Sequence, residues 1–319
     1  MVALPEAMDI DVFHGPWKSD SVLHRAFFDA RIWRVHIGQR DAAEPAPDLE
    51  WAALPGIPPR VAERRAARSL RVVRGTLEFV KRPRIVAIIP VLDEEGAIGP
   101  VLAAMPREWV DEVVVVDGGS RDRTVAQARA AGARVLVESE RGYGRACARG
   151  VAAAVEDGAE ILVFLDGDGG DRPEVIPSLV QPILDGKFDF VIGSRTRGTR
   201  EKGSMGVHQA LAGGVIGAAV GLVYGVRYTD MCAFRAIRAD GLARLGMREM
   251  TYGWNLEMQM RAARARLKIL ELPVPHGRRL AGHSKVAGTL RGTLKAGIRI
   301  FATFARVACE RRAPSKYER

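Results

Sequence analysis

Short apolar runs alternate with helical patterns between residues 84 and 193, and this alternation restricts the possible folds more than any other feature of the sequence. The runs lack polar alternation, which is typical of strands buried on both faces of a sheet. Helical connections between such strands favour a parallel sheet covered by helices. We therefore predict an α/β fold with a mostly parallel sheet, its strands at Ile85–Pro90, Glu112–Asp117, Ala133–Val137, Glu160–Leu165 and Phe188–Gly193. The intervening helices are predicted over Gly96–Met105, Asp122–Ala131, Tyr143–Glu156 and Pro173–Leu184.

Polar side chains gather where these strands end. Ligands of open parallel sheets bind beyond the carboxyl ends of the strands. The sequence therefore predicts a binding site at this edge, formed by Asp93, Glu94, Asp117, Asp166, Asp168, Ser194 and Arg195.

Two carboxylates, Asp166 and Asp168, follow the strand that ends at Leu165 and are separated by Gly167. Side chains at i and i+2 of an extended segment point the same way, so both acids can face one point. Neighbouring acids repel unless a positive charge lies between them. A divalent cation such as Mg²⁺ or Mn²⁺ meets that need. The alternative is a solvated Asp-Gly turn, which is a common motif.

The C-terminal third supplies cations and amphipathic segments. Basic loops are expected at Thr196–Met205 and Arg278–Lys285, with a strand between them at Lys268–Val274. An apolar, Gly-rich run from Ala210 to Val226 is short for a membrane span, so we expect a buried helix, or alternatively an interfacial one. A basic amphipathic helix is expected over Leu290–Arg312, and such a helix can pack on the sheet or lie on a membrane.

The first 80 residues carry no recognisable chemistry. An amphipathic helix is expected over Ser21–Arg34, a Pro-rich linker over Glu44–Pro59 and a basic helix face over Val61–Ser69. We predict two parts: an N-terminal extension, residues 1–80, and a catalytic domain, residues 81–319.

The net charge of +10 and the pI of 9.9 favour anionic partners. Arginine is spread along the chain, so no nucleic-acid patch is expected. High-GC codon usage, which favours arginine, is an alternative explanation for the excess of positive charge. Three cysteines without metal spacing indicate a reducing compartment. The acidic N-terminus does not resemble a signal peptide, so a cytoplasmic location is expected, with peripheral contact at the inner face of a membrane left open.

Several common sites are excluded by spacing. Gly142 and Gly144 precede a helix, but Cys147 occupies the third glycine position of a dinucleotide-binding motif. The turn after Asp117 lacks the lysine of a phosphate-binding P-loop. His276 and His283 are separated in sequence from Cys or acid clusters, so a zinc site is not expected.

Six motifs in order resemble glycosyltransferase family 2, with its GT-A fold, and within it the prokaryotic relatives of dolichyl-phosphate mannosyltransferase. The resemblance covers residues 84 to about 300. Its blocks are Pro90–Glu94, Asp117–Ser120, Asp166–Asp168, Gly193–Arg195, Thr229–Asp230 with Phe234–Arg235, and Arg279–Lys285. Asp93 stands where the family usually has Asn, and Gly170 stands where a Gln can assist the metal.

The resemblance implies roles for these residues. Asp166 and Asp168 would hold Mg²⁺ or Mn²⁺, and Asp168, Arg195 and Asp230 would be catalytic. Arg195, Arg200 and Arg235 would bind the acceptor. A GDP- or UDP-hexose donor would be bound by Pro90, Asp93, Glu94, Asp117, Asp166, Gly167, Arg279 and Lys285.

The implied reaction is displacement at the anomeric carbon with inversion. A polyprenyl or similar lipid phosphate is the preferred acceptor, because its second pKa of about 6 leaves a nucleophile at neutral pH. With this acceptor, Asp230 would orient neighbouring groups and would not remove a proton. With a soluble hydroxyl acceptor, Asp230 becomes the candidate base. A sugar-nucleotide pyrophosphorylase is a weaker alternative, since no basic glycine-rich loop follows the first strand.

Overall fold

The computed structural model describes residues 9–10, 34–38, 70–73, 76–79, 82–282 and 290–310. The chain divides into two units, Met1–Arg82 and Pro83–Arg319. In the first unit, β1 (Asp9–Ile10), β2 (Arg34–Gly38), β3 (Leu70–Val73) and β4 (Thr76–Phe79) form an antiparallel sheet. The linker and basic helix predicted in this unit lie outside the described residues, as does the helix predicted over Ser21–Arg34 apart from Arg34, which begins β2.

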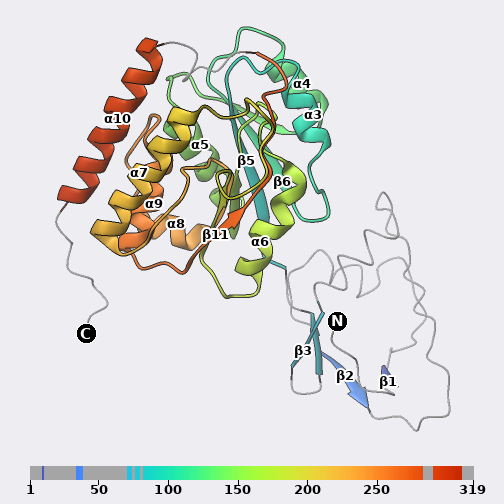
Figure 1. Ribbon diagram of the computed structural model, residues 1–319. Coiled ribbons are helices and arrows are strands. Elements are labelled where there is room, and N and C mark those ends of the chain that lie inside the picture. Colours follow the sequence, from blue (N-terminus) through green and yellow to red (C-terminus); the bar gives the residue numbers. More distant parts are fainter. Residues whose placement is uncertain are drawn as a thin grey trace. The chain divides into compact units, whose positions relative to one another are not determined.

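A seven-stranded sheet forms the centre of the second unit and confirms the predicted mixed α/β fold (Figure 1). Its order is β11-β9-β10-β8-β5-β6-β7, and every pairing is parallel except the two made by β10. The strands are β5 (Ile85–Val91), β6 (Glu112–Asp117), β7 (Arg134–Val137), β8 (Ile161–Phe164), β9 (Phe190–Ser194), β10 (Arg235–Arg238) and β11 (Ile269–Pro273).

Strand β10 was not predicted from the sequence. It has four residues and begins and ends with arginine, so it lacks the long apolar run that marks the other central strands. It inserts antiparallel between β8 and β9. Strands that follow one another along the chain, β8 and β9, are therefore not neighbours in the sheet.

Helices cover the sheet. They are α3 (Ile98–Ala103), α4 (Thr124–Ala130), α5 (Tyr143–Glu156), α6 (Ile176–Leu184), α7 (Val207–Tyr224), α8 (Ala239–Leu245), α9 (Trp254–Arg264) and α10 (Leu290–Cys309). Helix α5 packs on β5 and β6, α6 packs on β8, β9 and β10, and α9 contacts α5, α7, α8 and α10. The apolar helix α7 ends at Gly225, whose φ of 77° terminates the turn in the left-handed region. No helix in the described part of the chain is long and apolar enough to cross a membrane.

The core aligns the strand ends. Strand β8 is completely buried, and β5 is buried except at Pro90. Val91 of β5 pairs with Asp117 of β6, and Ile88 pairs with Phe164 of β8. The segments after these strands therefore emerge side by side, which brings residues 90–94, 117–118 and 165–168 to one edge of the sheet.

Candidate active site

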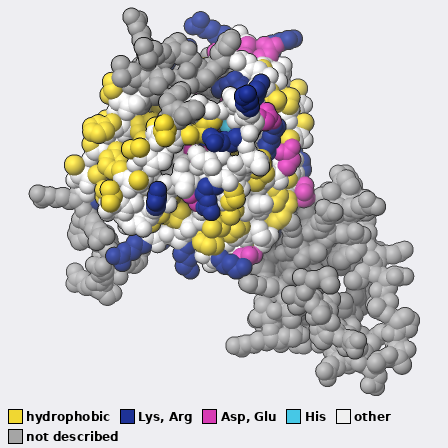
Figure 2. All heavy atoms as spheres, viewed as in Figure 1, with side chains coloured by type: hydrophobic (Ala, Val, Ile, Leu, Met, Phe, Trp, Pro, Cys, Tyr) yellow, Lys and Arg dark blue, Asp and Glu magenta, His cyan; other side chains and the backbone are white. Residues whose placement is uncertain are grey.

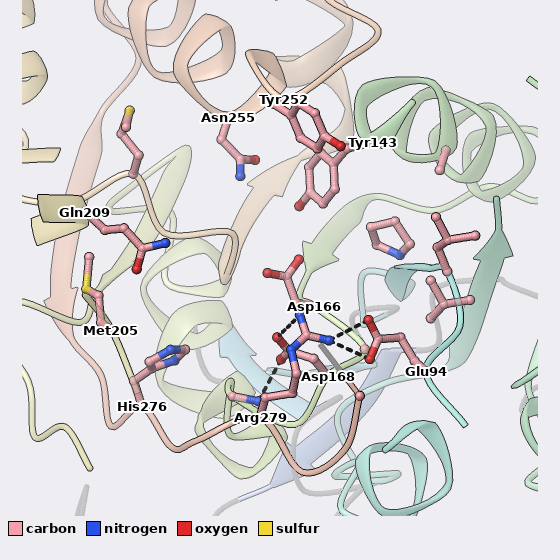
Figure 3. A pocket seen from close by; sticks show the side chains of 18 of the residues that line it. Glu94, Tyr143, Asp166, Asp168, Met205, Gln209, Tyr252, Asn255, His276 and Arg279 are labelled. Carbon is pink, nitrogen blue, oxygen red and sulfur yellow. Dashed lines mark hydrogen bonds and ion pairs between the residues drawn. The ribbon is translucent and has the colours of Figure 1, made fainter. Parts of the chain in front are cut away.

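A cavity of about 1040 Å³ opens at the carboxyl ends of β5, β6, β8 and β9. The strand ends contribute polar groups to it, and the starts of α5, α7 and α9 and the loop after β11 complete its wall (Figure 3). Among the predicted site residues, the cavity is lined by Pro90, Asp93, Glu94, Asp166, Gly167, Asp168, Arg195 and Arg279. The tertiary structure thus gathers residues that are far apart in the sequence of the second unit.

Arg279 joins two acids on opposite sides of the cavity floor. Its NH1 atom donates to both carboxylate oxygens of Glu94, each at 2.7 Å, and its NH2 atom lies 3.0 Å from Oδ2 of Asp168. Glu94 is buried, so this charge-assisted pair is shielded from water. Arg279 therefore already occupies the acidic cluster and faces the space that a ligand would fill (Figure 3).

Asp166 is the least compensated acid of the site. Burial, followed by the charges of Asp171 and Asp168, raises its pKa to about 8. Its backbone N–H donates to Oδ2 of Asp171 at 3.1 Å, which brings a third carboxylate to the same turn. The charges of Arg195 and Arg279 lower the pKa of Asp166 but do not outweigh burial and the neighbouring acids. A cation bound here would favour the ionised carboxylate.

His276 is separated in sequence from acid clusters, but the fold brings it next to one carboxylate. Its Nδ1 atom lies 3.5 Å from Oδ1 of Asp171 and is buried without a hydrogen bond. A Cβ added at Gly170 would lie 3.1 Å from Oδ1 of Asp168 and 3.4 Å from Nε2 of His276. The absence of a side chain at Gly170 thus allows a carboxylate and an imidazole to lie close to each other. Only the position of His276 just after β11, at the same sheet edge, could have indicated this.

The carboxylate oxygens at this place suit Mg²⁺ or Mn²⁺, which prefer oxygen ligands. As a transition-metal ion, Mn²⁺ also accepts an imidazole nitrogen. Asp171 beside the other ring nitrogen of His276 resembles the carboxylates that orient metal-binding histidines. Among the described residues, no three His, Cys, Asp or Glu side chains already form a metal cage. A cation at Asp168 and His276 would therefore need further oxygen ligands, which a diphosphate can supply.

Asp93 and Asp117 shape the turns after β5 and β6 at one end of the cavity. Asp117 is buried, and its carboxylate accepts hydrogen bonds from the backbone N–H groups of Gly119 and Ser120. Gly118, rather than Asp117, lines the cavity. Asp93 has a φ of 50° and accepts a hydrogen bond from the Arg121 backbone, so it fixes the neighbouring loop. A Cβ at Gly167 would lie 2.6 Å from Val91, so that site requires glycine.

Arg195 and Asp230 form a bidentate ion pair. Nε and NH2 of Arg195 each lie 2.8 Å from a different oxygen of Asp230, and the Arg195 N–H donates at 2.9 Å. Burial raises the pKa of Asp230, but the hydrogen bonds and charge of Arg195 outweigh burial and hold it below its ordinary value. Arg195 lines the cavity and Asp230 is buried behind it. This geometry favours an orienting role for Asp230 over a role as base.

Two other predicted residues, Arg235 and Arg200, do not line this cavity. Arg235 was expected to bind the acceptor, and this is wrong, because its side chain is fully buried against Phe190 and donates to the Cys232 and Asn255 carbonyls. Alternation along β10 turns it toward the core. Arg200 lines a smaller cavity of about 450 Å³ beside the main one. Lys285 lies outside the described residues.

The sequence did not indicate five further residues of the cavity wall: Tyr143, Met205, Gln209, Tyr252 and Asn255. They come from the starts of α5, α7 and α9 or the loops before them (Figure 3). None stands at a strand end, which is why the search along strand ends missed them.

Comparisons with known proteins agree on one family. Residues 86–246 match the family described as glycosyl transferase family 2. An uncharacterized glycosyltransferase of Mycobacterium tuberculosis is 34% identical over 214 residues, which cover 66% of this chain and 93% of that protein. The undecaprenyl-phosphate mannosyltransferase of Micrococcus luteus is 33% identical over 225 residues, with 66% and 90% covered.

A solved structure shows the same fold. Glucosyl-3-phosphoglycerate synthase from M. tuberculosis, in complex with Mn²⁺, UDP-glucose and phosphoglyceric acid, superposes with a TM-score of 0.60. The match covers 80% of this chain and 85% of that chain at 24% identity. The same enzyme has also been crystallised with Mg²⁺ and UDP.

Proposed function

The chain belongs to glycosyl transferase family 2, and we propose that it transfers a hexose, with inversion, from a GDP- or UDP-sugar to a polyprenyl phosphate. Family membership makes it a glycosyltransferase rather than a sugar-nucleotide pyrophosphorylase. The observation that supports a diphosphate donor best is the cluster of Asp166, Asp168 and Arg279 on the cavity floor.

Asp168 and His276, with Asp166 beside them, would hold Mg²⁺ or Mn²⁺, and the cation would neutralise the leaving diphosphate. The solved neighbour binds both ions. Arg279 now neutralises Glu94 and Asp168, so with a cation in place its guanidinium is available for the diphosphate oxygens. Pro90 and Glu94 would then border the nucleoside.

Arg195 would receive the acceptor phosphate. It faces the cavity, and Asp230 holds its guanidinium plane in one orientation. A phosphate dianion needs no strong base, which agrees with the lowered pKa of Asp230.

The outer faces of two helices beside the cavity favour a lipid acceptor. Gln209 of α7 and Ile300 of α10 line the cavity. The same helices expose large apolar side chains, and Figure 2 shows hydrophobic side chains gathered on this side of the domain, with Lys and Arg nearby. The exposed apolar residues are Leu211, Val215, Leu222 and Val223 of α7 and Ile298 and Phe301 of α10. Peripheral contact with a membrane would place the cavity at the depth of a lipid phosphate.

A soluble acceptor is the second candidate. Its support is the solved neighbour, which binds phosphoglyceric acid. In that case the acceptor hydroxyl would need a base, and Asp230 would have to leave Arg195 to act as one.

A transfer assay separates these alternatives. Radiolabelled UDP-glucose and GDP-mannose are offered with undecaprenyl phosphate, 3-phosphoglycerate or free sugars, in Mg²⁺, Mn²⁺ or EDTA. We expect labelled lipid, no product in EDTA, and no product from a folded Asp168→Ala variant. Transfer to 3-phosphoglycerate alone would reject the proposed lipid acceptor. Full activity in EDTA would reject the proposed requirement for a divalent cation.

A further inference from the structure

A tyrosine on the wall of the cavity has a buried hydroxyl group without a hydrogen bond of normal geometry. Tyr143 stands at the first turn of α5 and lines the cavity. Its Oη atom is buried and forms no hydrogen bond of normal geometry within the described structure. The side chains of Asn255 and Cys147 interact with it only weakly. Burial raises its pKa well above the ordinary value, so the hydroxyl keeps its proton. Buried polar groups without partners are rare in native proteins, and they often mark a place where a water or ligand binds.

The position of this tyrosine is rigidly determined. A Cβ added at Gly142 would lie 2.3 Å from the Met250 carbonyl oxygen, and one at Gly144 would lie 2.4 Å from that of Glu249. The backbone of α5 therefore lies directly on the segment before α9, and the Gly144 N–H donates to the Thr251 carbonyl at 3.2 Å. The unpartnered hydroxyl is not the result of a loose loop, and preorganisation of this kind is typical of binding groups.

Two further side chains come from the same packed segment. Tyr252 and Asn255 line the cavity beside Tyr143, and the three lie across it from Glu94 and Arg279 (Figure 3). Tyr252 is 39% exposed, so part of its surface is available to a ligand. These side chains are uncharged, whereas the opposite wall carries the charges suited to a diphosphate. Aromatic surface with neutral donors and acceptors suits the apolar faces and hydroxyls of a pyranose ring.

We infer that Tyr143, with Tyr252 and Asn255, forms the subsite for the transferred sugar, and that the Tyr143 hydroxyl hydrogen-bonds a hydroxyl group of that sugar. This inference rests on the proposed function. It assigns the uncharged wall to the hexose and leaves the wall of Glu94 and Arg279 to the nucleoside diphosphate. Tyr143 is then a residue that selects the sugar.

The test compares ligands with and without the sugar. Titration calorimetry with Mn²⁺ measures the binding of UDP-glucose, GDP-mannose, UDP and GDP to wild type and Tyr143→Phe. The variant should bind the preferred nucleotide sugar about 5- to 10-fold more weakly, the typical effect of one hydrogen bond. It should bind the matching nucleoside diphosphate as wild type does. Its Tm should change little, because no hydrogen bond of normal geometry is lost from the free protein.

Tyr228→Phe is the matched control. The Tyr228 hydroxyl is also buried, but it donates to the Gln259 carbonyl at 3.0 Å and does not line the cavity. This variant should have a lower Tm and unchanged affinity for all four ligands. Asn255→Ala should repeat the loss of sugar affinity seen with Tyr143→Phe.

Two results would overturn the subsite. One is an equal loss of affinity for the diphosphate alone, which would place Tyr143 at the nucleoside. The other is unchanged sugar affinity in both Tyr143→Phe and Asn255→Ala. A wild type that binds neither nucleotide sugar would instead reject the proposed function, and the subsite with it.

Discussion

At the residue scale, Gly170 provides a test of the proposed cation site. It lies between Asp168 and His276, and a Cβ there would meet Cε1 of His276 at 2.8 Å and Oδ1 of Asp168 at 3.1 Å. We expect Gly170→Ala to displace the imidazole and to weaken Mn²⁺-dependent binding of UDP by about 10- to 100-fold, as for other changes around metal ligands. Titration calorimetry with Mn²⁺, in the presence and absence of EDTA, measures the affinity of the variant for UDP.

The control for this prediction is Gly99→Ala. Gly99 lies in α3, and a Cβ there would meet nothing within 4 Å. Alanine is favoured over glycine in helices, so this variant should keep or gain stability and bind UDP normally. Equal binding of UDP by Gly170→Ala and Gly99→Ala would remove His276 from the cation site.

The Arg195–Asp230 pair predicts a specific dependence of stability on pH. The pKa of Asp230 is lowered in the folded protein, so the pair stabilises the fold above the ordinary Asp pKa of about 3.9 and loses this effect as the pH falls through the folded pKa. Asp230→Asn should cost about 3 kcal/mol of unfolding free energy at pH 7, since it removes one partner of a buried pair. The difference from wild type should be constant between pH 6 and 8 and shrink in acid.

Asp240→Asn is the control, because Asp240 pairs with Arg238 and both side chains are largely exposed. Its stability should match that of wild type. Urea unfolding across pH measures both variants. If Asp230 were instead the base, the acid limb of the wild-type pH profile of kcat/KM would disappear in Asp230→Asn.

At the scale of elements, a buried ionic network ties α10 to the wall of the cavity. Glu257 of α9 is fully buried, and its Oε1 accepts hydrogen bonds from Arg306 of α10 at 2.9 Å and from Arg261 at 3.0 Å. Glu249 accepts hydrogen bonds from Arg306 and Thr303 of α10. The segment between these acids carries Tyr252 of the cavity wall. Helix α10 is therefore bound, through these ion pairs and hydrogen bonds, to the segment that forms part of the cavity wall.

Arg306→Ala should weaken this support. Glu257 would lose one of the two cations that hydrogen-bond to its Oε1 atom, and buried charges left with fewer partners destabilise proteins. We expect a drop in Tm of several degrees by calorimetry. Arg299→Ala, on the exposed face of the same helix, should leave Tm unchanged. An unchanged Tm in both variants would show that the network contributes nothing.

At the scale of the whole molecule, the net charge and the exposed apolar side chains lead us to expect contact with an anionic membrane. The chain carries a net charge of +10, and α7 and α10 expose Leu222 at 90% and Phe301 at 74%. Near an anionic surface each cation contributes roughly 1 kcal/mol. We expect the protein to float with vesicles containing phosphatidylglycerol and to be released by high salt.

The double variant Leu222→Ser and Phe301→Ser should lose most of this flotation. Val155→Ser on α5 is the control, since Val155 is also exposed, at 46%, but lies on another helix. Full flotation of the double variant would show that these two helices do not contact the membrane.

The sequence by itself determined the parallel strands of the second unit and the acids at their ends, but not the antiparallel β10. Apolar runs such as Val113–Val116 and Ile161–Phe164 are local features, and a strand that is buried on both faces needs little beyond them. The placement of Glu94, Asp166, Asp168 and Arg195 at one edge follows, because parallel strands all end at the same edge.

Only the tertiary structure decided which distant groups meet. Arg279 bonds Glu94 across 185 positions of the chain, His276 reaches Asp171, and Tyr143 packs on the segment before α9. The side chain of Arg235 lies in the core because β10 inserts between β8 and β9. This strand is too short to be recognised from the sequence. Periodicity and propensity act over a few residues, whereas these contacts depend on sheet order and on how loops pack against one another.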